Sequence, residues 1–412
     1  MRTAFFASLR EETRRMAADR NILLVLVIAP LVYTLVFGLT YYNAKVTDLP
    51  VVVVDADRSA ASRSIIRALD ATESLAVLEV LPDEGPVRDM LVREKAWAAV
   101  ILPRDMEREL KQGHQITVPV LVNTSNIIIG NYAWKGAQAA LGTSGAMVGM
   151  DRMVRRGVSS SQVRASYQPI ELQTRTLFNP GSNYAFFVTP LLIVLLIHQI
   201  VALAAGMSVA KHGNEDLYVP SPEHTFQDRV RDLFAEAMRM QSRLSPYVIT
   251  GTFWMVISIV GTHPWLGIPR PASFGTALLL GVLLAWNGSL LGTLAGALIK
   301  DKIGVVQVLF FLSMPLLLLS GGSWPLEAMP WFIRGIAIVL PSTHAMTAYR
   351  ALALEGASFF RVLPVLSILV MSGVVLCLAT AAALRSHHIA PESLPEHVAA
   401  PGSDPMADPL PA

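Results

Sequence analysis

Long apolar runs constrain this chain more than any other feature of its sequence. Each run approaches or exceeds the roughly 17 residues that a helix needs to cross the ~30 Å hydrocarbon core of a bilayer. Lipid offers no partners for backbone amide groups, so a spanning segment must be a helix or part of a closed barrel. The six expected spans are residues 21–42, about Tyr184–Val209, about Pro246–Thr262, about Phe274–Leu298, about Val305–Ser320 and about Val362–Leu384. We therefore expect an α-helical membrane protein with six transmembrane helices.

Composition excludes several other classes of protein. The chain of 412 residues is 53% hydrophobic and 16% charged, whereas a typical soluble domain has about 25% charged residues. A formal net charge of +2 gives no basis for nucleic-acid binding. The single cysteine, Cys377, lies inside an apolar run, so we expect no disulfide framework and no clustered metal site.

Residues 1–20 are predicted to form an amphipathic helix on the cytoplasmic face. Its basic residues are Arg2, Arg10, Arg14, Arg15 and Arg20, and its apolar residues at near-helical spacing are Phe5, Phe6, Leu9 and Met16. The arginines place the N-terminus inside the cell by the positive-inside rule, and six spans return the C-terminus there. The run 21–42 is too long for a signal-peptide core and indicates an uncleaved anchor. The polar, proline-rich tail 385–412 is expected to be disordered.

Between the first two spans, residues 43–183 show strands alternating with helices. Strands are expected at LPVVVVDAD, LAVLEVL, AWAAVIL and ITVPVLVNTSN, and helices at SAASRSIIRALD, VRDMLVRE, DMERELKQG and about 128–155. Asp57 or Ser59 is expected to cap the first helix, and Pro103 to occupy the first position of the third. This alternation predicts an α/β domain with a largely parallel sheet. Because one span follows a cytoplasmic N-terminus, the domain is expected to be extracytoplasmic.

The sequence contains no catalytic or nucleotide-binding motif. It lacks G-x-x-x-x-G-K-[ST], H-E-x-x-H and G-x-S-x-G, so the chain is not expected to hydrolyse ATP or to be an enzyme. Asp55 and Asp57 lie at a strand end, where helix capping is favoured over an acid/base pair. We expect neither a catalytic residue nor a cofactor in this chain.

Segment 221–244, between the second and third spans, has the pattern of an amphipathic helix. Thr225 and Asp228 form a capping-box pair. The residues proposed to dock a cytoplasmic motor are Thr225, Phe226, Val230, Leu233, Phe234 and Met238. An apolar stripe on such a helix must be buried against lipid or protein. The alternative is a surface helix that packs on its own bundle.

Small and polar residues inside the spans suggest helix packing and a substrate path. Gly288, Gly292 and Gly296 form two overlapping G-x-x-x-G steps, which let helix backbones approach closely. The candidate path residues are His198, Gln199, Asn287 and Gln307. Polar groups at that depth face protein or water. Hydrogen bonding between helices is the favoured alternative for each of them.

Residues 321–350 are predicted to form a re-entrant helical hairpin before the last span. The residues that mark it are Gly321, Gly322, Trp324, Pro325 and Pro341. Glycine and proline at a membrane boundary permit non-helical backbone, and Trp324 suits the interface. The alternative is an ordinary loop with a surface helix.

Several stretches, in this order, resemble the ABC-2 type permeases, the membrane subunits of bacterial ABC exporters of the YhhJ/YbhR kind. They are VVVVDADRSAASRSIIRAL, AAVILPRDMERELKQG, LFNPGSNYAFFVTP and SGGSWPLEAMP with LPSTHAMTAYRAL. The resemblance covers nearly the whole chain except the tail. It implies two permease chains, as a homodimer or heterodimer, driven by two separate ATPase subunits that carry ATP and magnesium.

The same resemblance places the ATPase contact at roughly residues 214–243. There the chain reads AKHGNEDLYVPSPEHTF, which departs from the basic and acidic Gly-Thr segment of relatives. It also implies a periplasmic adaptor protein as an optional partner and the bacterial inner membrane as the location.

Two functions follow from these observations. The first is a permease subunit of an exporter for a hydrophobic or amphipathic substrate, such as a drug or lipid. The alternative is a membrane-anchored receptor or envelope-assembly protein acting through its extracytoplasmic domain. An intramembrane enzyme is a weak third, because no nucleophile–base set lies at membrane depth.

Overall fold

The computed structural model describes residues 2–43, 45–155, 157, 176–179, 183–212 and 226–388. For residues 2–4, 152, 155, 212, 226–236 and 385–388 the backbone alone is described. Thr225 and the predicted tail beyond 388 lie outside these ranges. The chain divides into two compact units, one of Met1–Tyr42 with Ala185–Ala412 and one of Asn43–Tyr184.

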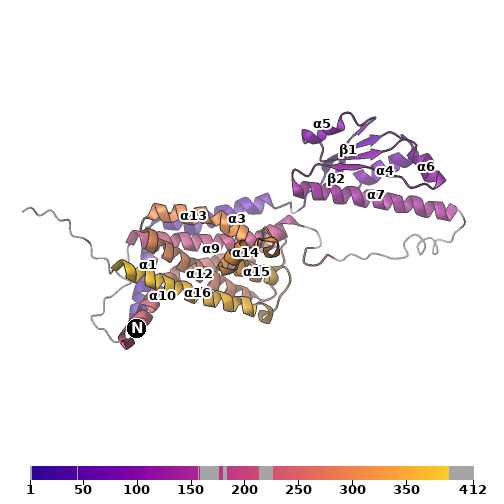
Figure 1. Cartoon of the computed structure of the whole chain (residues 1–412). Helices are drawn as coiled ribbons and strands as arrows, with labels where there is room; N and C mark the ends of the chain where they lie inside the picture. The colour runs from indigo at the N-terminus through magenta and orange to yellow at the C-terminus, as the bar shows by residue number, and fades with distance from the viewer. Residues whose placement is uncertain are drawn as a thin grey trace, which may run out of the picture. The chain divides into compact units, whose positions relative to one another are not determined.

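The first unit is a bundle of long helices (Figure 1). It begins with α1 (Arg2–Ala18), α2 (Arg20–Leu23), a π-helical turn (Leu24–Ile28) and α3 (Ala29–Thr40). It continues with α9 (Tyr184–His212), α10 (Phe226–Ile257), a second π-helical turn (Ser258–Thr262) and α11 (His263–Trp265). The remaining helices are α12 (Phe274–Ile299), α13 (Lys302–Leu319), a 3-10 turn (Leu326–Ala328), α14 (Trp331–Val339), α15 (Pro341–Ala353) and α16 (Phe359–His388).

Six stretches of this unit are long and apolar enough to cross a membrane. They are Arg20–Thr40, Tyr184–Lys211, Ala237–Trp265, Phe274–Ile299, Lys302–Leu319 and Phe359–Leu384. The helical membrane protein expected from the sequence is therefore confirmed, with each span found where an apolar run predicted it. Polar residues set several of the starts: Ser273 caps α12 through the Thr276 N–H, and Asp301 caps α13 through the Gly304 N–H.

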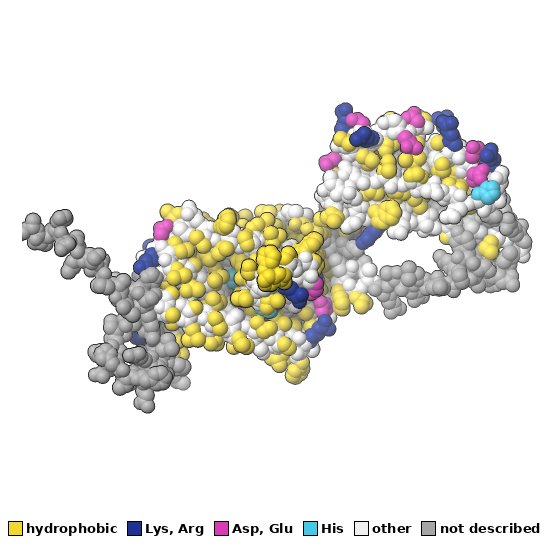
Figure 2. All heavy atoms as spheres, viewed as in Figure 1, with side chains coloured by type: hydrophobic (Ala, Val, Ile, Leu, Met, Phe, Trp, Pro, Cys, Tyr) yellow, Lys and Arg dark blue, Asp and Glu magenta, His cyan; other side chains and the backbone are white. Residues whose placement is uncertain are grey.

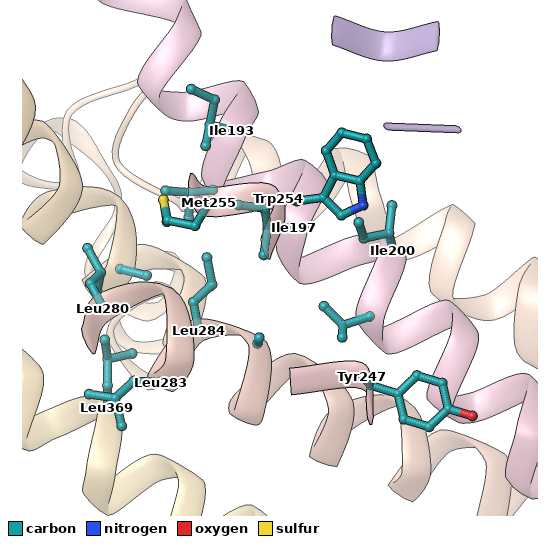
Figure 3. Packing of buried hydrophobic residues seen from close by; sticks show 14 of the residues in the cluster. Ile193, Ile197, Ile200, Tyr247, Trp254, Met255, Leu280, Leu283, Leu284 and Leu369 are labelled. Atoms are coloured by element: carbon teal, nitrogen blue, oxygen red, sulfur yellow. The ribbon is translucent and has the colours of Figure 1, made fainter. Parts of the chain in front are cut away.

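The core of the bundle forms where α9, α10, α12 and α16 meet. Figure 3 shows Ile197 of α9 beside Met255 of α10, with Leu284 of α12 and Leu369 of α16 close by. Ile197, Met255, Leu284 and Leu369 are each at most 1% exposed. Outside this core, hydrophobic side chains cover most of the visible surface of the bundle, and charged side chains gather at its ends (Figure 2). An apolar surface with charged ends is what a membrane-spanning bundle presents to lipid.

The docking segment is not a separate helix that ends before the third span. It forms one continuous helix with that span, α10, and Pro246 lies inside it. A proline inside a helix removes a backbone donor and disturbs the preceding turn. Membrane helices tolerate proline where hydroxyl groups and neighbouring helices occupy the freed backbone groups. The carbonyl that loses its donor at Pro246 is that of Ser242, and the adjacent Gln241 carbonyl accepts from Ser245 Oγ at 2.8 Å.

The second unit is built on a four-stranded sheet of order β2-β1-β3-β4. The strands are β1 (Leu49–Asp55), β2 (Leu75–Leu81), β3 (Ala98–Leu102) and β4 (Val120–Val122). β1 pairs in parallel with β2 and β3, and β4 joins β3 antiparallel. The fourth strand is thus much shorter than ITVPVLVNTSN predicted, and the sheet is largely but not wholly parallel.

Helices cover both faces of this sheet (Figure 1). Val51 and Val53 pack toward α4 (Ala60–Asp70), α6 (Met106–Gln112) and α7 (Ile127–Arg155). Val52 and Val54 pack toward α5 (Val87–Val92) on the other face. All four valines are at most 1% exposed because alternate side chains of a strand point to opposite faces.

Local capping in this unit differs from the prediction at one helix. Ser59 caps α4, as one of the two alternatives proposed. The prediction that Pro103 starts the third helix was wrong, because α6 begins at Met106 after Asp105 in a left-handed conformation. Asp57 Oδ2 instead accepts from the backbone N–H of Glu107 at that helix start, 3.1 Å away. Asp55 Oδ1 accepts from the Arg58 N–H at 2.7 Å, so both aspartates bind backbone groups, but neither caps the next helix, α4, as the capping interpretation expected.

Candidate functional site

Two buried carboxylates, one in α1 and one directly after it, connect the N-terminal helix to the bundle. The first is Glu12, which is 2% exposed. Its Oε2 accepts from Arg243 Nε of α10 at 3.1 Å, and its Oε1 accepts from Tyr247 OH at 2.7 Å. Ser208 Oγ of α9 donates to the same Oε1 at 2.5 Å. One carboxylate therefore joins α1 to two spans whose sequence positions are about 200 residues away.

Asp19 makes the second connection, at the junction of α1 and α2. Lys211 Nζ of α9 and Lys302 Nζ of α13 each approach Asp19 Oδ2 to 2.8 Å. Asp19 Oδ1 also caps α2 by accepting from the Asn21 N–H at 2.9 Å. Burial alone would raise the pKa of Asp19, but the lysine and backbone hydrogen bonds outweigh it and lower the pKa well below its usual range. Asp19 therefore stays ionised and holds three helices at one end of the bundle.

The sequence interpretation missed both carboxylates, although a signal for them exists. Phe5, Leu9, Glu12, Met16 and Asp19 recur at the three- and four-residue steps of one helix face. The apolar stripe of the N-terminal helix thus contains two acidic residues where further apolar ones are expected. A carboxylate on a buried stripe requires a basic partner on the surface it covers.

The glycine steps of α12 pack against α9 of the same chain. A Cβ built on Gly288 would lie 2.9 Å from the His198 carbonyl oxygen, and one built on Gly296 would lie 2.5 Å from that of Gly206. A Cβ on Gly292 would overlap the carbonyl of Ala202. The three glycines therefore allow backbone-to-backbone contact along three consecutive turns of both helices.

Three of the four candidate path residues lie within the bundle, but they do not share one site. Gln199 Nε2 donates to the Leu309 carbonyl of α13 at 2.8 Å. Asn287 Nδ2 donates to the Leu369 carbonyl of α16 at 3.0 Å, and its Oδ1 accepts from Ser372 Oγ at 2.9 Å. These contacts match the alternative of inter-helix hydrogen bonding. His198 is 1% exposed, and its ring nitrogens have no hydrogen-bond partner among the described residues. Gln307 is exposed on α13.

The docking residues can be placed only in part. Phe226, Val230, Leu233 and Phe234 belong to the first turns of α10, where the backbone alone is described. Met238 lies one turn after Phe234 and is 38% exposed. The helix that carries these residues is the one that Glu12 holds through Arg243.

The residues predicted to mark the hairpin form a short connection after α13. Gly321 has a φ of +73°, Gly322 is buried, Trp324 is 57% exposed, Pro325 precedes the 3-10 turn and Pro341 is the first residue of α15. Thr343 Oγ1 donates to the Leu319 carbonyl at 3.2 Å, which brings α15 back to the end of α13.

A buried polar pair anchors α15 to the end of the third span. His263 Nδ1 lies 2.8 Å from the Pro269 carbonyl, which can only accept, so this nitrogen carries the proton. In the neutral ring, Nε2 then accepts from Tyr349 OH at 2.9 Å. Both residues are fully buried. The segment between α13 and α16 is therefore fixed to the bundle through α15. In contrast, Phe332, Ile336 and Val339 of α14 are more than half exposed.

This geometry carries no catalytic constellation among the described residues; it provides a spanning bundle whose helices are tied together at one end by buried ion pairs. Six helices long and apolar enough to span a bilayer define the class of helical membrane proteins. The sequence pattern of ABC-2 family transporter proteins matches residues 20–215 and 242–382, and the chain belongs to this family. The resemblance inferred from the sequence is thereby confirmed.

Three bacterial relatives span nearly the same length. The chain is 23% identical over 365 residues to the inner membrane transport permease YhhJ of Escherichia coli, covering 86% of this chain and 89% of the relative. It is 21% identical over 365 residues to the probable multidrug ABC transporter permease YbhS of the same organism, covering 84% and 87%. It is 22% identical over 360 residues to the probable multidrug ABC transporter permease YbhR, covering 85% and 89%.

Proposed function

We propose that this chain is the permease subunit of an ATP-driven exporter in the bacterial inner membrane. The observation that carries the proposal is the combination of six apolar spans with a family match over both halves of the chain. The sequence has no P-loop motif, and the family implies a separate ABC ATPase, so we assign ATP and magnesium to a partner subunit. The family also implies that two permease chains work together.

The proposed cargo is a hydrophobic or amphipathic molecule, drug-like or lipid-like. Two relatives carry "multidrug" in their names, and the spans of this chain have an apolar surface. We place both termini in the cytoplasm and the α/β unit outside it, because residues 1–20 are rich in arginine and one span separates them from that unit. In that position, the α/β unit is available to a periplasmic adaptor protein.

Coupling to the motor is proposed to pass through α10. Its first turns carry the apolar stripe of residues 226–238, and the helix continues into the third span without interruption. Arg243 on the same helix is bound to Glu12 of α1. A displacement of the start of α10 by an ATPase would therefore be transmitted to a span and to the N-terminal helix together.

Co-purification tests this assignment. The chain is extracted from native membranes in mild detergent, and the proteins that accompany it are identified. We expect an ATPase with the native chain and its loss with Met238→Asp or Phe234→Asp, because a carboxylate in the apolar stripe opposes burial against a partner. The matched control is Leu78→Asp on β2, where the native leucine is 55% exposed; this variant is expected to retain the ATPase.

The outcomes separate the parts of the proposal. If folded Met238→Asp and Phe234→Asp chains both retain the ATPase, the docking assignment is wrong. The proposal that the chain is an exporter permease would still stand. Recovery of periplasmic proteins without any ATPase would favour the second candidate, a receptor or envelope-assembly protein acting through the α/β unit.

A further inference from the structure

A second polar feature lies beside the Glu12 ion pair, in a cavity between α1 and α10. The cavity has a volume of about 420 Å³ and is lined by Ala7, Ser8, Glu11, Glu12 and Arg15 of α1 and by Arg239 and Arg243 of α10. On each helix the lining residues follow the three- and four-residue spacing of one face, so the two faces enclose the space between them. The described lining residues include three arginines and two glutamates, so their formal charges sum to +1.

The buried guanidinium of Arg243 is only partly satisfied by protein. Its side chain is 9% exposed, and its Nε donates to Glu12. Nη1 and Nη2 are buried and have no hydrogen-bond partner among the described residues. Nε of Arg239, one turn earlier, is buried and likewise has no partner within the described ranges. A buried charged donor without a partner is strongly unfavourable, so these groups indicate a ligand with several acceptor oxygens.

The two glutamates do not fill that role. Glu12 already accepts from Ser208, Tyr247 and Arg243. Glu11 is half exposed and pairs with Arg15 through Arg15 Nε at 3.3 Å. The planar guanidinium of Arg243 has one edge on Glu12 and leaves its terminal N–H groups for a second anion. Arginine binds phosphate oxygens in this forked manner.

The depth of the cavity indicates where the anion comes from. Arg239 and Arg243 lie near the start of the span Ala237–Trp265, and Arg15 shortly precedes the span Arg20–Thr40. With a rise of about 1.5 Å per residue, Arg243 lies about 9 Å along its span. Arg239 lies about 3 Å along the same span, so the two arginines bracket the inner edge of the headgroup layer, which is about 5–8 Å thick on each side of a ~30 Å hydrocarbon core. A carboxylate of another protein would have to enter the bundle to reach it, whereas lipid phosphates already lie at that level.

We propose that the cavity between α1 and α10 binds the phosphate group of an anionic phospholipid, with Arg239 and Arg243 as the principal donors. Ser8 adds a hydroxyl group at the α1 side of the cavity. The inference requires only the membrane-spanning fold and does not depend on the proposed export activity. Binding there would join the lipid to the two helices that Glu12 already connects.

The test uses the full-length chain, delipidated in a nonionic detergent, with short-chain phosphatidylglycerol as the probe. Thermal unfolding is followed as the lipid is added, because a ligand of the folded state raises the midpoint in a saturable manner. Phosphatidylcholine, whose phosphate is balanced by choline, is the lipid control. Inorganic phosphate tests whether a soluble anion suffices.

Arg239→Gln is the main variant, because the buried Nε of Arg239 has no hydrogen-bond partner among the described residues that the substitution would break. We expect its apparent affinity for phosphatidylglycerol to fall about tenfold, the loss of one charge-assisted donor. The matched control is Arg334→Gln, which removes the same charge from an exposed position on α14 and should bind like the native chain. Arg243→Lys keeps a positive charge beside Glu12 but lacks the planar guanidinium group, so we expect this variant also to bind phosphatidylglycerol more weakly. It replaces Arg239→Gln as the main variant if Arg239→Gln fails to fold.

Each result decides the proposal. A response to phosphatidylglycerol that Arg239→Gln or Arg243→Lys weakens and Arg334→Gln preserves supports a lipid site. An equal response to inorganic phosphate, lost in the same variants, supports the phosphate site but identifies its ligand as a soluble anion. Unchanged binding by folded Arg239→Gln and Arg243→Lys, or equal weakening by Arg334→Gln, overturns the proposal.

Discussion

Glu12 and Arg243 form an ion pair at 3.1 Å although 231 positions separate them in the chain, and both side chains are less than a tenth exposed. The pair is the point at which the N-terminal helix, a helix outside the apolar spans, is fixed to the third span. A buried pair of this kind resists separation, because each charge left alone in a low-dielectric environment is strongly destabilising. Motions of α1 and α10 are therefore expected to be coupled.

The first prediction concerns that pair. Glu12→Gln leaves Arg243 buried without its carboxylate and should lower the free energy of unfolding by about 3–5 kcal/mol. Glu11→Gln, one position away, removes a carboxylate that is half exposed and should change the free energy of unfolding by less than ~1 kcal/mol. Thermal unfolding in detergent measures both. Equal shifts for the two variants would contradict the buried connection.

The second prediction concerns the pH dependence of Asp19. Its pKa in the folded chain is below the unfolded value of about 3.9, so its stabilising contribution is present above that value and is lost as the pH falls toward the folded pKa. Asp19→Asn should therefore lower the unfolding midpoint by a constant amount at pH 5–8, and the difference from the native chain should shrink below about pH 4. A difference that stays constant down to pH 3 would show that Asp19 does not contribute as an ion. Lys302→Gln, which removes one of its two lysine partners, should give a smaller loss with the same trend.

The third prediction concerns the contact between α9 and α12. Gly292→Ala places a methyl group onto the Ala202 carbonyl and should destabilise the bundle by about 1–3 kcal/mol through overpacking. Gly275→Ala provides the control on the same helix, because, apart from its chain neighbours and the backbone of its own helix, no atom of the described chain lies within 4 Å of its Cβ position. Alanine favours helix there by up to about 1 kcal/mol over glycine. We expect the two variants to shift the unfolding midpoint in opposite directions. An unchanged midpoint for Gly292→Ala would mean that α9 and α12 can move apart without loss of stability.

The spans could be predicted because the bilayer imposes a length and a composition on each of them. The predicted run about 274–298 corresponds to α12 at Phe274–Ile299, and every other run overlaps a span, although the third span begins at Ala237 and not at Pro246. Propensity alone could not predict that α10 continues through Pro246, since the neighbouring groups that permit proline there come from the surrounding fold.

The polar connections were harder to predict than the helices. Glu12 and Asp19 stand in the apolar stripe of α1, and that stripe was readable, but their partners are Arg243, Lys211 and Lys302 on other helices. A single sequence shows which residues share one face of a helix. It does not show which other helix packs against that face. The same limit applied to the G-x-x-x-G steps, whose spacing indicated close packing but not that α9 is the partner.

The fourth prediction concerns the orientation proposed for the chain. In a Cys377→Ser background, Arg88→Cys on α5 should react with a membrane-impermeant maleimide in cells whose outer membrane has been permeabilised. Lys300→Cys, at the exposed turn between α12 and α13, should react only after the inner membrane is opened. Both native side chains are exposed, so burial cannot explain a difference. The reverse pattern would place the α/β unit in the cytoplasm.

The fifth prediction concerns the surface at which two permease chains meet. Gln307 is a polar residue within the span Lys302–Leu319, and its side chain is exposed beside large apolar ones such as Phe311, which is 78% exposed. A polar group that faces lipid is unfavourable, so we expect α13 to face the second chain of the proposed dimer. With Cys377→Ser as background, Gln307→Cys should form a disulfide-linked dimer in native membranes under mild oxidation, seen on a non-reducing gel.

Met371→Cys on α16 is the matched control, because the native side chain is 68% exposed and the exposed residues one turn later, Val374 and Val375, are apolar. We expect most of the Gln307→Cys chain and little of the Met371→Cys chain to run as a dimer. The opposite result would place the dimer contact at α16 and leave Gln307 without a protein partner. In the expected arrangement, Gln199 supports the same surface from within, since its side chain binds the Leu309 carbonyl of α13.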